Sequence, residues 1–345
     1  MPCTPAIATM SVGRAWVHTL PAKLTQIAAA GFKGVELFYE DLEYLAREHS
    51  PSPSAPGAEI HEPALLAAAQ TTKQLCDTLD LQIISLQPFL FYEGLVDRAA
   101  HAQRLTKLRT WFRLARTLGT DLIQIPSNFL LPATETTGDW DVIVADMREI
   151  AELGRQERPV IRFAYENLAW GTYVSTWETL WDVVQRVNRP NFGACLDTFN
   201  IAGRVWADPA AVSGRVAGDA DGLLRESLAR LVRTVDVRKV FYVQVVDAER
   251  LAAPLGEGHP FYVEGQPARM SWSRNARLFL YEHEKGGYLP VVEVARAFLN
   301  DLKFEGWVSM ELFSRSLAEA DPAVPREHAR RGMRAWELLR AELAL

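Results

Sequence analysis

Four short hydrophobic runs in the second half of the chain each carry one oxygen-bearing side chain at or near the C-terminal end. The four side chains are Glu166 in VIRFAYEN, Asp197 in FGACLDTFN, Gln244 in VFYVQVVD and Glu311 in WVSMELF. If the runs are successive strands of a parallel barrel, these side chains converge at one end of it. Three carboxylates and one amide oxygen, completed by water and substrate, suit Mg²⁺, Mn²⁺ or Co²⁺ better than structural Zn²⁺. The pattern therefore predicts a divalent-metal site and an enzyme.

Each of these residues also has a simpler interpretation. An acidic residue at a strand end is often a helix cap or a solvated loop residue, and this interpretation competes for any one of them. Glu166 and Asp197 each follow a largely apolar run, where an unpaired carboxylate would be costly to bury. Gln244 lies between two valines, and its neutral amide offers a carbonyl oxygen while keeping the negative charge of the site at three. The metal site is therefore the better interpretation of the set.

The elements that must position these residues alternate along the whole chain. Strand-like runs are expected at 6–10, 34–38, 82–87, 121–126, 160–166, 191–197, 240–244 and 307–311. Helical patterns are expected at 21–30, 63–79, 98–118, 139–156, 176–187, 221–232, 289–302 and 324–343. Eight strand-helix units with parallel pairing close into a (β/α)₈ TIM barrel, which is an α/β fold. Neither a repeat nor a low-complexity linker is found, so residues 1–345 are predicted to form one domain.

Two connections that follow strands are long for a compact domain. Residues 202–221 follow the sixth strand, and residues 247–287 follow the seventh and are rich in glycine and proline. Such connections usually carry function or are disordered, and loops after barrel strands lie at the end where these barrels place their chemistry. Residues 247–287 are therefore predicted to form a lid-like insertion over the mouth of the barrel. Residues 50–56 are predicted to be a flexible loop.

The composition is typical of a globular protein that acts on a small molecule. The 345 residues are 48% hydrophobic and 23% charged, with a net charge of −6 and no long run of lysine and arginine. This balance argues against a nucleic-acid or membrane partner. Cys3, Cys76 and Cys195 are widely spaced, which indicates neither a disulfide framework nor a zinc knuckle. No signal peptide or spanning stretch is expected, so the predicted location is the cytoplasm; an oligomer is possible.

The order of the four oxygen ligands resembles that of a known family. Glutamate after the fifth strand, aspartate after the sixth, glutamine or histidine after the seventh and glutamate after the eighth are similar to the xylose-isomerase-like barrels of sugar isomerases, epimerases and dehydratases. Longer stretches narrow the resemblance to the fungal 3-dehydroshikimate dehydratases of quinate catabolism: QVVDAERL, ARMSWSRNARLF, RVNRPNFGACLDTFNIAGR and GWVSMELF. The resemblance runs from about Ala6 to the last helix. It implies a divalent metal ion and an anionic small-molecule substrate, 3-dehydroshikimate, which loses water to give protocatechuate.

The implied reaction gives the metal a clear task. Removing the proton at C4 of 3-dehydroshikimate gives an enolate at the C3 ketone, the enolate expels the C5 hydroxyl, and tautomerisation yields the aromatic ring. A divalent ion that binds the C3 oxygen and the C4 hydroxyl acts as a Lewis acid on the developing negative charge. The leaving hydroxide also needs a proton donor.

The resemblance also implies roles for residues around the metal. A Ser-Arg-x-x-Arg pattern is present as Ser273, Arg274 and Arg277. It is expected to place Ser273 and Arg277 on the substrate carboxylate or hydroxyls rather than on the metal, although both arginines could also be solvated loop charges. Bacterial relatives carry a histidine where this chain has Asn200 and an arginine where it has Leu90. These two departures leave open which residue is the base.

Further polar residues near strand ends complete the predicted site. Glu36 in GVELF is predicted to be a base or a group that hydrogen-bonds the substrate, with a purely structural contact as the alternative. The residues predicted to bind the substrate, besides the Ser-Arg-x-x-Arg group, are Gln87, Gln124, Asn128 and Asn167. The predicted catalytic group consists of Glu36, Asn200, Ser273 and Arg277.

Two other functions can occupy the same barrel. A sugar or inosose isomerase or epimerase would share the metal site and would form no aromatic product. A metal-dependent apurinic endonuclease would need a histidine-rich cluster of metals and a basic groove, and the sequence indicates neither.

Overall fold

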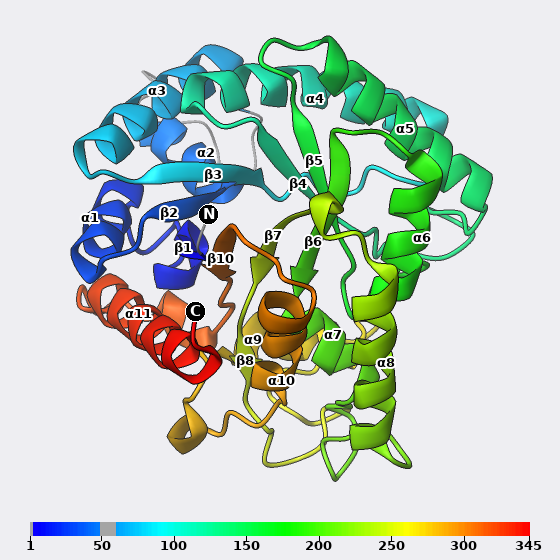
Figure 1. The fold of residues 1–345 in the computed structure, drawn as a ribbon. Helices are drawn as coiled ribbons and strands as arrows, with labels where there is room; N and C mark the ends of the chain where they lie inside the picture. The colour runs from blue at the N-terminus through cyan, green and yellow to red at the C-terminus, as the bar shows by residue number, and fades with distance from the viewer. Residues whose placement is uncertain (1–2, 49–59) are drawn as a thin grey trace.

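A closed barrel of eight parallel strands forms the centre of the molecule. The computed structural model describes residues 3–48 and 60–345, and the strand order around the barrel is β1-β10-β7-β6-β5-β4-β3-β2 (Figure 1). The barrel strands are β1 Thr4–Ala8, β2 Gly34–Phe38, β3 Gln82–Gln87, β4 Leu122–Pro126, β5 Arg162–Glu166, β6 Phe192–Asp197, β7 Val240–Gln244 and β10 Trp307–Met310. The (β/α)₈ fold predicted from the sequence is confirmed.

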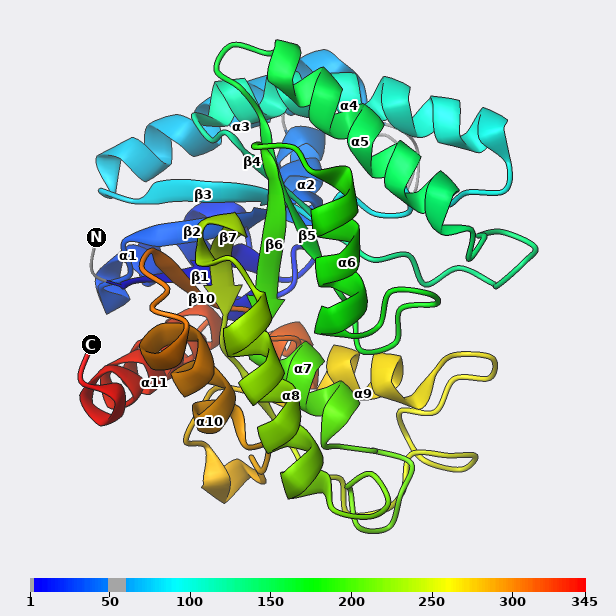
Figure 2. The ribbon, with the colours of Figure 1, turned by 45° about the vertical axis from the view of Figure 1, so that its right-hand side comes forward.

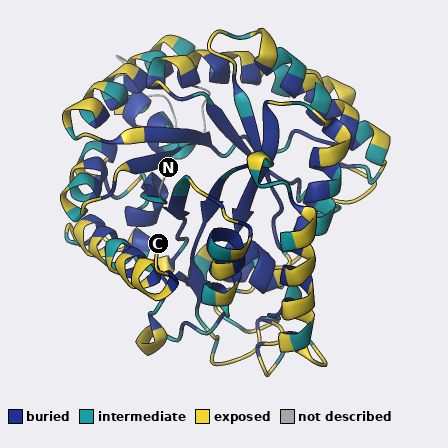
Figure 3. Cartoon of the chain, in the orientation of Figure 1, coloured by how far each residue is buried: buried dark blue, intermediate teal, exposed yellow. Residues whose placement is uncertain are grey.

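Helices surround the barrel on the outside. They include α1 Leu20–Ala30, α3 Glu62–Thr78, α4 Arg98–Leu118, α5 Trp140–Gln156, α6 Trp177–Val187, α8 Ala220–Thr234 and α11 Val324–Leu343. The strands are buried, and the outer faces of the helices are exposed (Figure 3). All six residues of β6 are buried, because a parallel strand covered on both faces needs an apolar run rather than an alternating one.

Helix α6 shows how the sequence fixes an element locally. The Thr176 side chain accepts a hydrogen bond from the Thr179 backbone N–H, and the Thr179 hydroxyl accepts one from the Thr176 N–H. This reciprocal capping box satisfies two donors at the start of the helix. Asn188 ends it in the left-handed conformation, with φ of 47°, a conformation that asparagine tolerates better than most residues.

Some boundaries differ from those expected from the sequence. The first strand ends at Ala8 rather than at residue 10, because Thr9–Val12 form a 3₁₀ turn. The helix predicted at 289–302 is α10, Val291–Arg296, which continues as a π-helical turn over Ala297–Asp301.

Three helices were not predicted: α2 Tyr39–Glu48, α7 Thr198–Val205 and α9 Ala268–Ala276. Helices α2 and α7 each begin at the residue that follows a strand, so no turn residues separate the two elements. Because α7 occupies the start of the predicted long connection at 202–221, the irregular part of that connection is only 206–219. The loop predicted at 50–56 lies outside the described residues.

The predicted lid at 247–287 has secondary structure of its own. Strand β8, Asp247–Ala248, pairs in antiparallel fashion with β9, Arg277–Leu278, and so joins the start of the segment to its last third. Helix α9 directly precedes β9, and the stretch before α9 projects away from the barrel (Figure 2). Movement of this segment as a lid stays a prediction. Within residues 3–48 and 60–345, no helix is both long enough and apolar enough to cross a membrane.

A buried histidine attaches α11 to the loop that follows β10. His328 is 2% exposed. Its Nδ1 lies 2.9 Å from the Val324 carbonyl oxygen, and its Nε2 lies 2.9 Å from the Ser316 hydroxyl. Burial, and then the positive charge of Arg331, lower the pKa of His328 to about 4. The folded protein therefore keeps this imidazole neutral at pH values where an exposed histidine is protonated.

We expect His328 to make the protein less stable in mild acid. The unfolded chain binds this proton near pH 6.5 and the folded chain only near pH 4, so stability falls as the pH drops through that interval. At pH 5 the expected loss is about 2 kcal/mol relative to pH 7. Urea unfolding of the wild type and of His328→Gln at both pH values measures it, and the variant should lose less stability. The exposed His61→Gln is the control, and an unchanged pH dependence in His328→Gln would refute the assignment.

Candidate active site

The barrel brings seven polar side chains to within two residues of the C-terminal ends of its strands. They are Glu36, Gln87, Gln124, Glu166, Asp197, Gln244 and Glu311. Strand register sets their level, since Asp197 lies opposite Gln244 and Gln244 lies opposite Ser309 in neighbouring strands. Each of the seven is at most 4% exposed. The chain therefore buries several charges at the end of the barrel where such folds place their chemistry.

Three carboxylates form the centre of this group. Glu166, Asp197 and Glu311 each offer an oxygen that lies within 4.8 Å of the other two. Asn200 bridges two of them, because its Nδ2 donates to Glu166 Oε1 and to Asp197 Oδ2, both at 2.8 Å. Gln124 donates through Nε2 to the other oxygen of Glu166. Neutral amides therefore hold the carboxylates in place without adding charge.

Gln244 has one satisfied and one unsatisfied amide atom. Its Nε2 donates to the Glu36 carboxylate, at 3.0 Å from Oε2 and 3.2 Å from Oε1. Its Oε1 is buried and has no hydrogen-bond partner in the described part of the chain. A buried carbonyl oxygen without a partner is costly unless a ligand binds it. This free oxygen and the three carboxylates fit the donor set that Mg²⁺ and Mn²⁺ prefer.

Glu36 lies fully buried among hydrogen-bond donors. Its carboxylate accepts from Gln87 Nε2 at 3.0 Å, from Gln244 and from the Ser309 hydroxyl. Gln87 Nε2 also donates to Glu311 Oε1 at 3.0 Å. These contacts suit a group that positions its neighbours, and the role of Glu36 as a base or as a substrate contact stays a prediction. Ser309 was missed, although it precedes Glu311 by two residues and so shares its face of the strand.

Arg277 lies directly against two of the predicted metal ligands. Its Nη1 is 3.1 Å from Asp197 Oδ2 and 3.1 Å from Glu311 Oε2, and its Nε donates to the Ser273 hydroxyl at 3.0 Å. The guanidinium is 1% exposed and lies over the ring of Phe199, 4.2 Å from its centroid. The sequence separated Arg277 from the metal ligands, and the structure brings them into contact.

Burial raises the pKa of four carboxyl groups at this end of the barrel: Glu36, Glu166, Asp197 and Glu311. The pKa of Glu36 rises to about 8, with burial as the first cause and the negative charge of Glu311 as the second. The positive charge of Arg277 opposes the rise in the pKa of Asp197 and Glu311. The guanidinium of Arg277 contacts only two of the four carboxyl groups, and a bound divalent cation would supply the missing positive charge.

A small cavity of about 140 Å³ opens beside these residues. Seven of the predicted site residues line it: Gln87, Gln124, Glu166, Ser273, Arg274, Arg277 and Glu311. Of these, Arg274 is exposed. Asn128 is not among the lining residues, because its Nδ2 donates to the Glu93 carbonyl and its Oδ1 accepts from the Leu130 N–H. Asn167 is buried beside Glu166 and does not line the cavity either.

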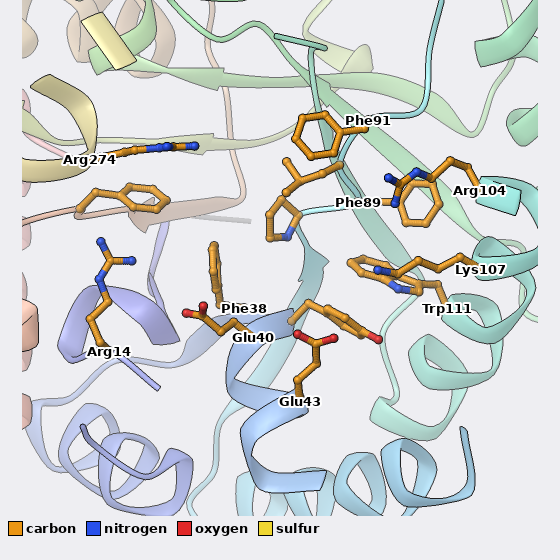
Figure 4. A pocket seen from close by; sticks show the side chains of 14 residues that line it. Arg14, Phe38, Glu40, Glu43, Phe89, Phe91, Arg104, Lys107, Trp111 and Arg274 are labelled. Atoms are coloured by element: carbon orange, nitrogen blue, oxygen red, sulfur yellow. The ribbon is translucent and has the colours of Figure 1, made fainter. Parts of the chain in front are cut away.

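A second cavity of about 510 Å³ adjoins the small one, and Figure 4 shows the residues that line it. The two share five lining residues, which are Phe38, Pro88, Leu90, Arg274 and Phe313. Leu90, at the position where the bacterial pattern has an arginine, thus borders both cavities. We call the larger one the outer cavity, because none of the seven buried polar side chains at the end of the barrel lines it.

The chain is similar to known proteins over its whole length. Residues 24–339 match the model of the family described as "Xylose isomerase-like TIM barrel". The chain is 53% identical to the 3-dehydroshikimate dehydratase of Neurospora crassa, over 100% of this chain and 96% of that enzyme. It is 31% identical to the 3-dehydroshikimate dehydratase of Pseudomonas aeruginosa, over 90% of this chain and 38% of that enzyme.

A solved structure shows the same architecture. A xylose isomerase-like TIM barrel/4-hydroxyphenylpyruvate dioxygenase fusion protein superposes with a TM-score of 0.72 and 26% identity, over 99% of this chain and 44% of that chain. The chain thus spans less than half of the fusion protein and of the Pseudomonas aeruginosa enzyme, and nearly all of the Neurospora crassa enzyme. Its closed parallel barrel and its match over residues 24–339 establish that the chain belongs to the xylose isomerase-like TIM barrel family.

Proposed function

We propose that this protein is a 3-dehydroshikimate dehydratase that removes water from 3-dehydroshikimate to give protocatechuate, a step of quinate and shikimate catabolism. The observation that carries the proposal is the 53% identity to a curated 3-dehydroshikimate dehydratase across nearly the full length of both chains. The buried carboxylate centre supports it, because the reaction passes through an enolate whose negative charge must be stabilised.

The same geometry supports a divalent metal ion held by the three carboxylates of Glu166, Asp197 and Glu311, together with Gln244 Oε1. The raised pKa values of the three carboxyl groups and the unsatisfied amide oxygen of Gln244 are the observations behind this assignment. When bound, such an ion acts as a Lewis acid toward the ketone and hydroxyl oxygens of the substrate. Mg²⁺, Mn²⁺ and Co²⁺ are the candidates.

Side chains of the protein would orient the metal ligands and bind the substrate. Asn200 and Gln124 fix the Glu166 carboxylate, so that little reorganisation is needed when charge develops. Arg277 lines the small cavity and uses Nη1 and Nε for Asp197, Glu311 and Ser273. Its Nη2 takes part in no hydrogen bond found among the described residues, so we assign it and the Ser273 hydroxyl to a substrate oxygen. The apolar walls of the cavity exclude bulk water from the enolate.

The first prediction from this proposal concerns turnover and its need for metal. The purified protein should convert 3-dehydroshikimate to an aromatic product, which its ultraviolet absorbance reveals. Treatment with a chelator should abolish turnover, and Mg²⁺, Mn²⁺ or Co²⁺ should restore it. Full activity in a preparation shown by elemental analysis to be metal-free would exclude the metal site.

Failure to form any aromatic product would refute the dehydratase assignment. In that case, chromatography after incubation with ketohexoses and inososes would test the isomerase and epimerase alternative. A loss of function through unfolding is excluded by recording circular dichroism of the same metal-free sample.

A second prediction concerns Glu36 as a positioning residue. The Glu36 carboxylate holds the amide of Gln244 with its nitrogen bound and its oxygen free. Glu36→Ala should let that amide turn and lower Mn²⁺ affinity by about 10- to 100-fold, the usual effect of losing a group that orients a ligand. Isothermal titration calorimetry measures it, and Glu36→Gln, which keeps an acceptor oxygen, should lose less.

The matched control for Glu36 is another buried glutamate. Glu93 is 2% exposed and accepts from the Asn128 N–H and the Tyr165 hydroxyl. Glu93→Gln should leave Mn²⁺ affinity unchanged within about twofold, since neither contact involves a predicted metal ligand. Equal losses of affinity in Glu36→Ala and Glu93→Gln would show a general effect of disturbing the barrel, and the positioning role would be abandoned.

A further inference from the structure

The carboxylate of the substrate needs a positively charged partner. The centre formed by Glu166, Asp197 and Glu311 has no cationic side chain free for it. This inference rests on the proposed function, in which the substrate is a monocarboxylate. Arg277 is already shared between Asp197 and Glu311, so little of its charge is left for a third anion. A carboxylate that entered among four acidic groups would be repelled. The cation that receives it must therefore lie toward the outer cavity.

Arg14 has a fixed backbone and a guanidinium without a polar partner. Its N–H donates to the Leu317 carbonyl at 2.9 Å, and the carbonyl of the preceding Gly13 accepts from Lys23 Nζ at 2.8 Å. Lys23 is fully buried and forms an ion pair with Asp41. The guanidinium lies over the rings of Trp16, at 5.5 Å, and Phe313, at 5.9 Å. Among the residues described, it makes no hydrogen bond and no ion pair within 4.0 Å.

Arg274 lines the same outer cavity as Arg14, although it lies in a distant part of the sequence. It belongs to α9, borders both the small and the outer cavity, and lies 5.9 Å from the ring centroid of Phe129. Its Nη1 donates to Gln266 at 3.0 Å, which leaves its remaining donors for a ligand. Burial, and then the like charge of Arg14, lower the pKa of Arg274. The two guanidinium groups thus repel each other, as expected of a pair that is completed by an anion.

The arrangement of the outer cavity agrees with a site for one anionic group. Figure 4 shows Arg14 and Arg274 on the same side of the cavity, with Arg104 and Lys107 on the opposite side. Phe313 borders both cavities and lies under Arg14. Glu40 also lines the outer cavity and stabilises the charge of Arg14, but forms no ion pair with it within the described chain. An incoming carboxylate can therefore reach Arg14 without displacing an existing salt bridge.

We propose that Arg14 and Arg274 together bind the carboxylate of the substrate at the junction of the two cavities. The ring of the substrate then lies in the small cavity, with its ketone and hydroxyl oxygens toward Glu166 and Glu311. Phe38, Leu90 and Phe313 form the apolar contacts at the junction. Guanidinium groups suit this task, because their planar donors match the two oxygens of a carboxylate.

The test compares the acid substrate with its neutral methyl ester. Arg14→Gln and Arg274→Gln should each lower kcat/KM for 3-dehydroshikimate by about 10- to 100-fold, the scale of a lost charge-assisted hydrogen bond, and mainly by raising KM. Neither substitution should change kcat/KM for the methyl ester, so the preference for acid over ester should collapse. Inhibition constants of protocatechuate and its methyl ester provide the same comparison if the wild type does not turn over the ester.

Two controls separate carboxylate binding from damage to the fold. Arg250→Gln removes an exposed arginine of the same segment that lines neither cavity, and it should keep the preference of the wild type. Arg274→Lys should recover part of the lost preference, because it restores the charge. Equal losses for acid and ester in Arg14→Gln and Arg274→Gln, or no loss for either, would overturn the inference. A wild type that does not convert 3-dehydroshikimate would instead overturn the proposed function.

Discussion

Four carboxyl groups are buried within one end of this barrel, with a single arginine between two of them. Burying a carboxylate is unfavourable unless it is paired and hydrogen-bonded, and the surrounding structure meets this demand in stages. Arg277 neutralises part of the charge of Asp197 and Glu311. Amide groups of Gln87, Gln124 and Asn200 donate hydrogen bonds but carry no charge. The remaining negative charge is what a divalent cation would balance.

This charge distribution also favours one orientation of the proposed substrate. A pocket with acidic groups at its base repels an anion there and accepts one only at its opening, where Arg14 and Arg274 lie. A molecule with a carboxylate at one end and a ketone with neighbouring hydroxyls at the other then has a single favourable orientation. The same acidic centre therefore serves the chemistry at one end of the substrate and dictates where its other end must be bound.

The barrel could be predicted from the sequence because each strand is an apolar run followed by a helical pattern, and this signal is local. The convergence of Glu166, Asp197 and Glu311 followed from the fold, since strand ends meet at one rim. Helices α2 and α7 could not be separated from the strands before them, because no turn residues mark the junction. The barrel strands were therefore easier to predict than the helices that follow them without a turn.

Contacts between side chains from distant segments were harder to foresee. Glu36 and Gln244 are 208 positions apart, and nothing local shows that one holds the amide of the other. Arg277 was expected to face the substrate, and its contacts with two acidic residues depend on the path of a loop that sequence patterns do not define. Arg14 was not among the predicted site residues, because an arginine in a short connection is usually solvated. Only the cavity beside Phe313 makes it relevant.

The short pairing of β8 with β9 has a consequence for how the protein can vary. The backbone of Arg277 is held by this pairing and by a hydrogen bond from its N–H to the Phe313 carbonyl at 3.0 Å, and its side chain bonds Ser273 of the adjoining helix α9, so the loop that precedes α9 takes no direct part in holding it. Within that loop, a side chain added at Gly256, Gly258 or Gly265 would meet no neighbouring atom within 4 Å. Insertions and deletions between residues 256 and 265 can therefore accumulate during evolution, or be engineered as attachment points for another domain, while the guanidinium keeps its place among the carboxylates.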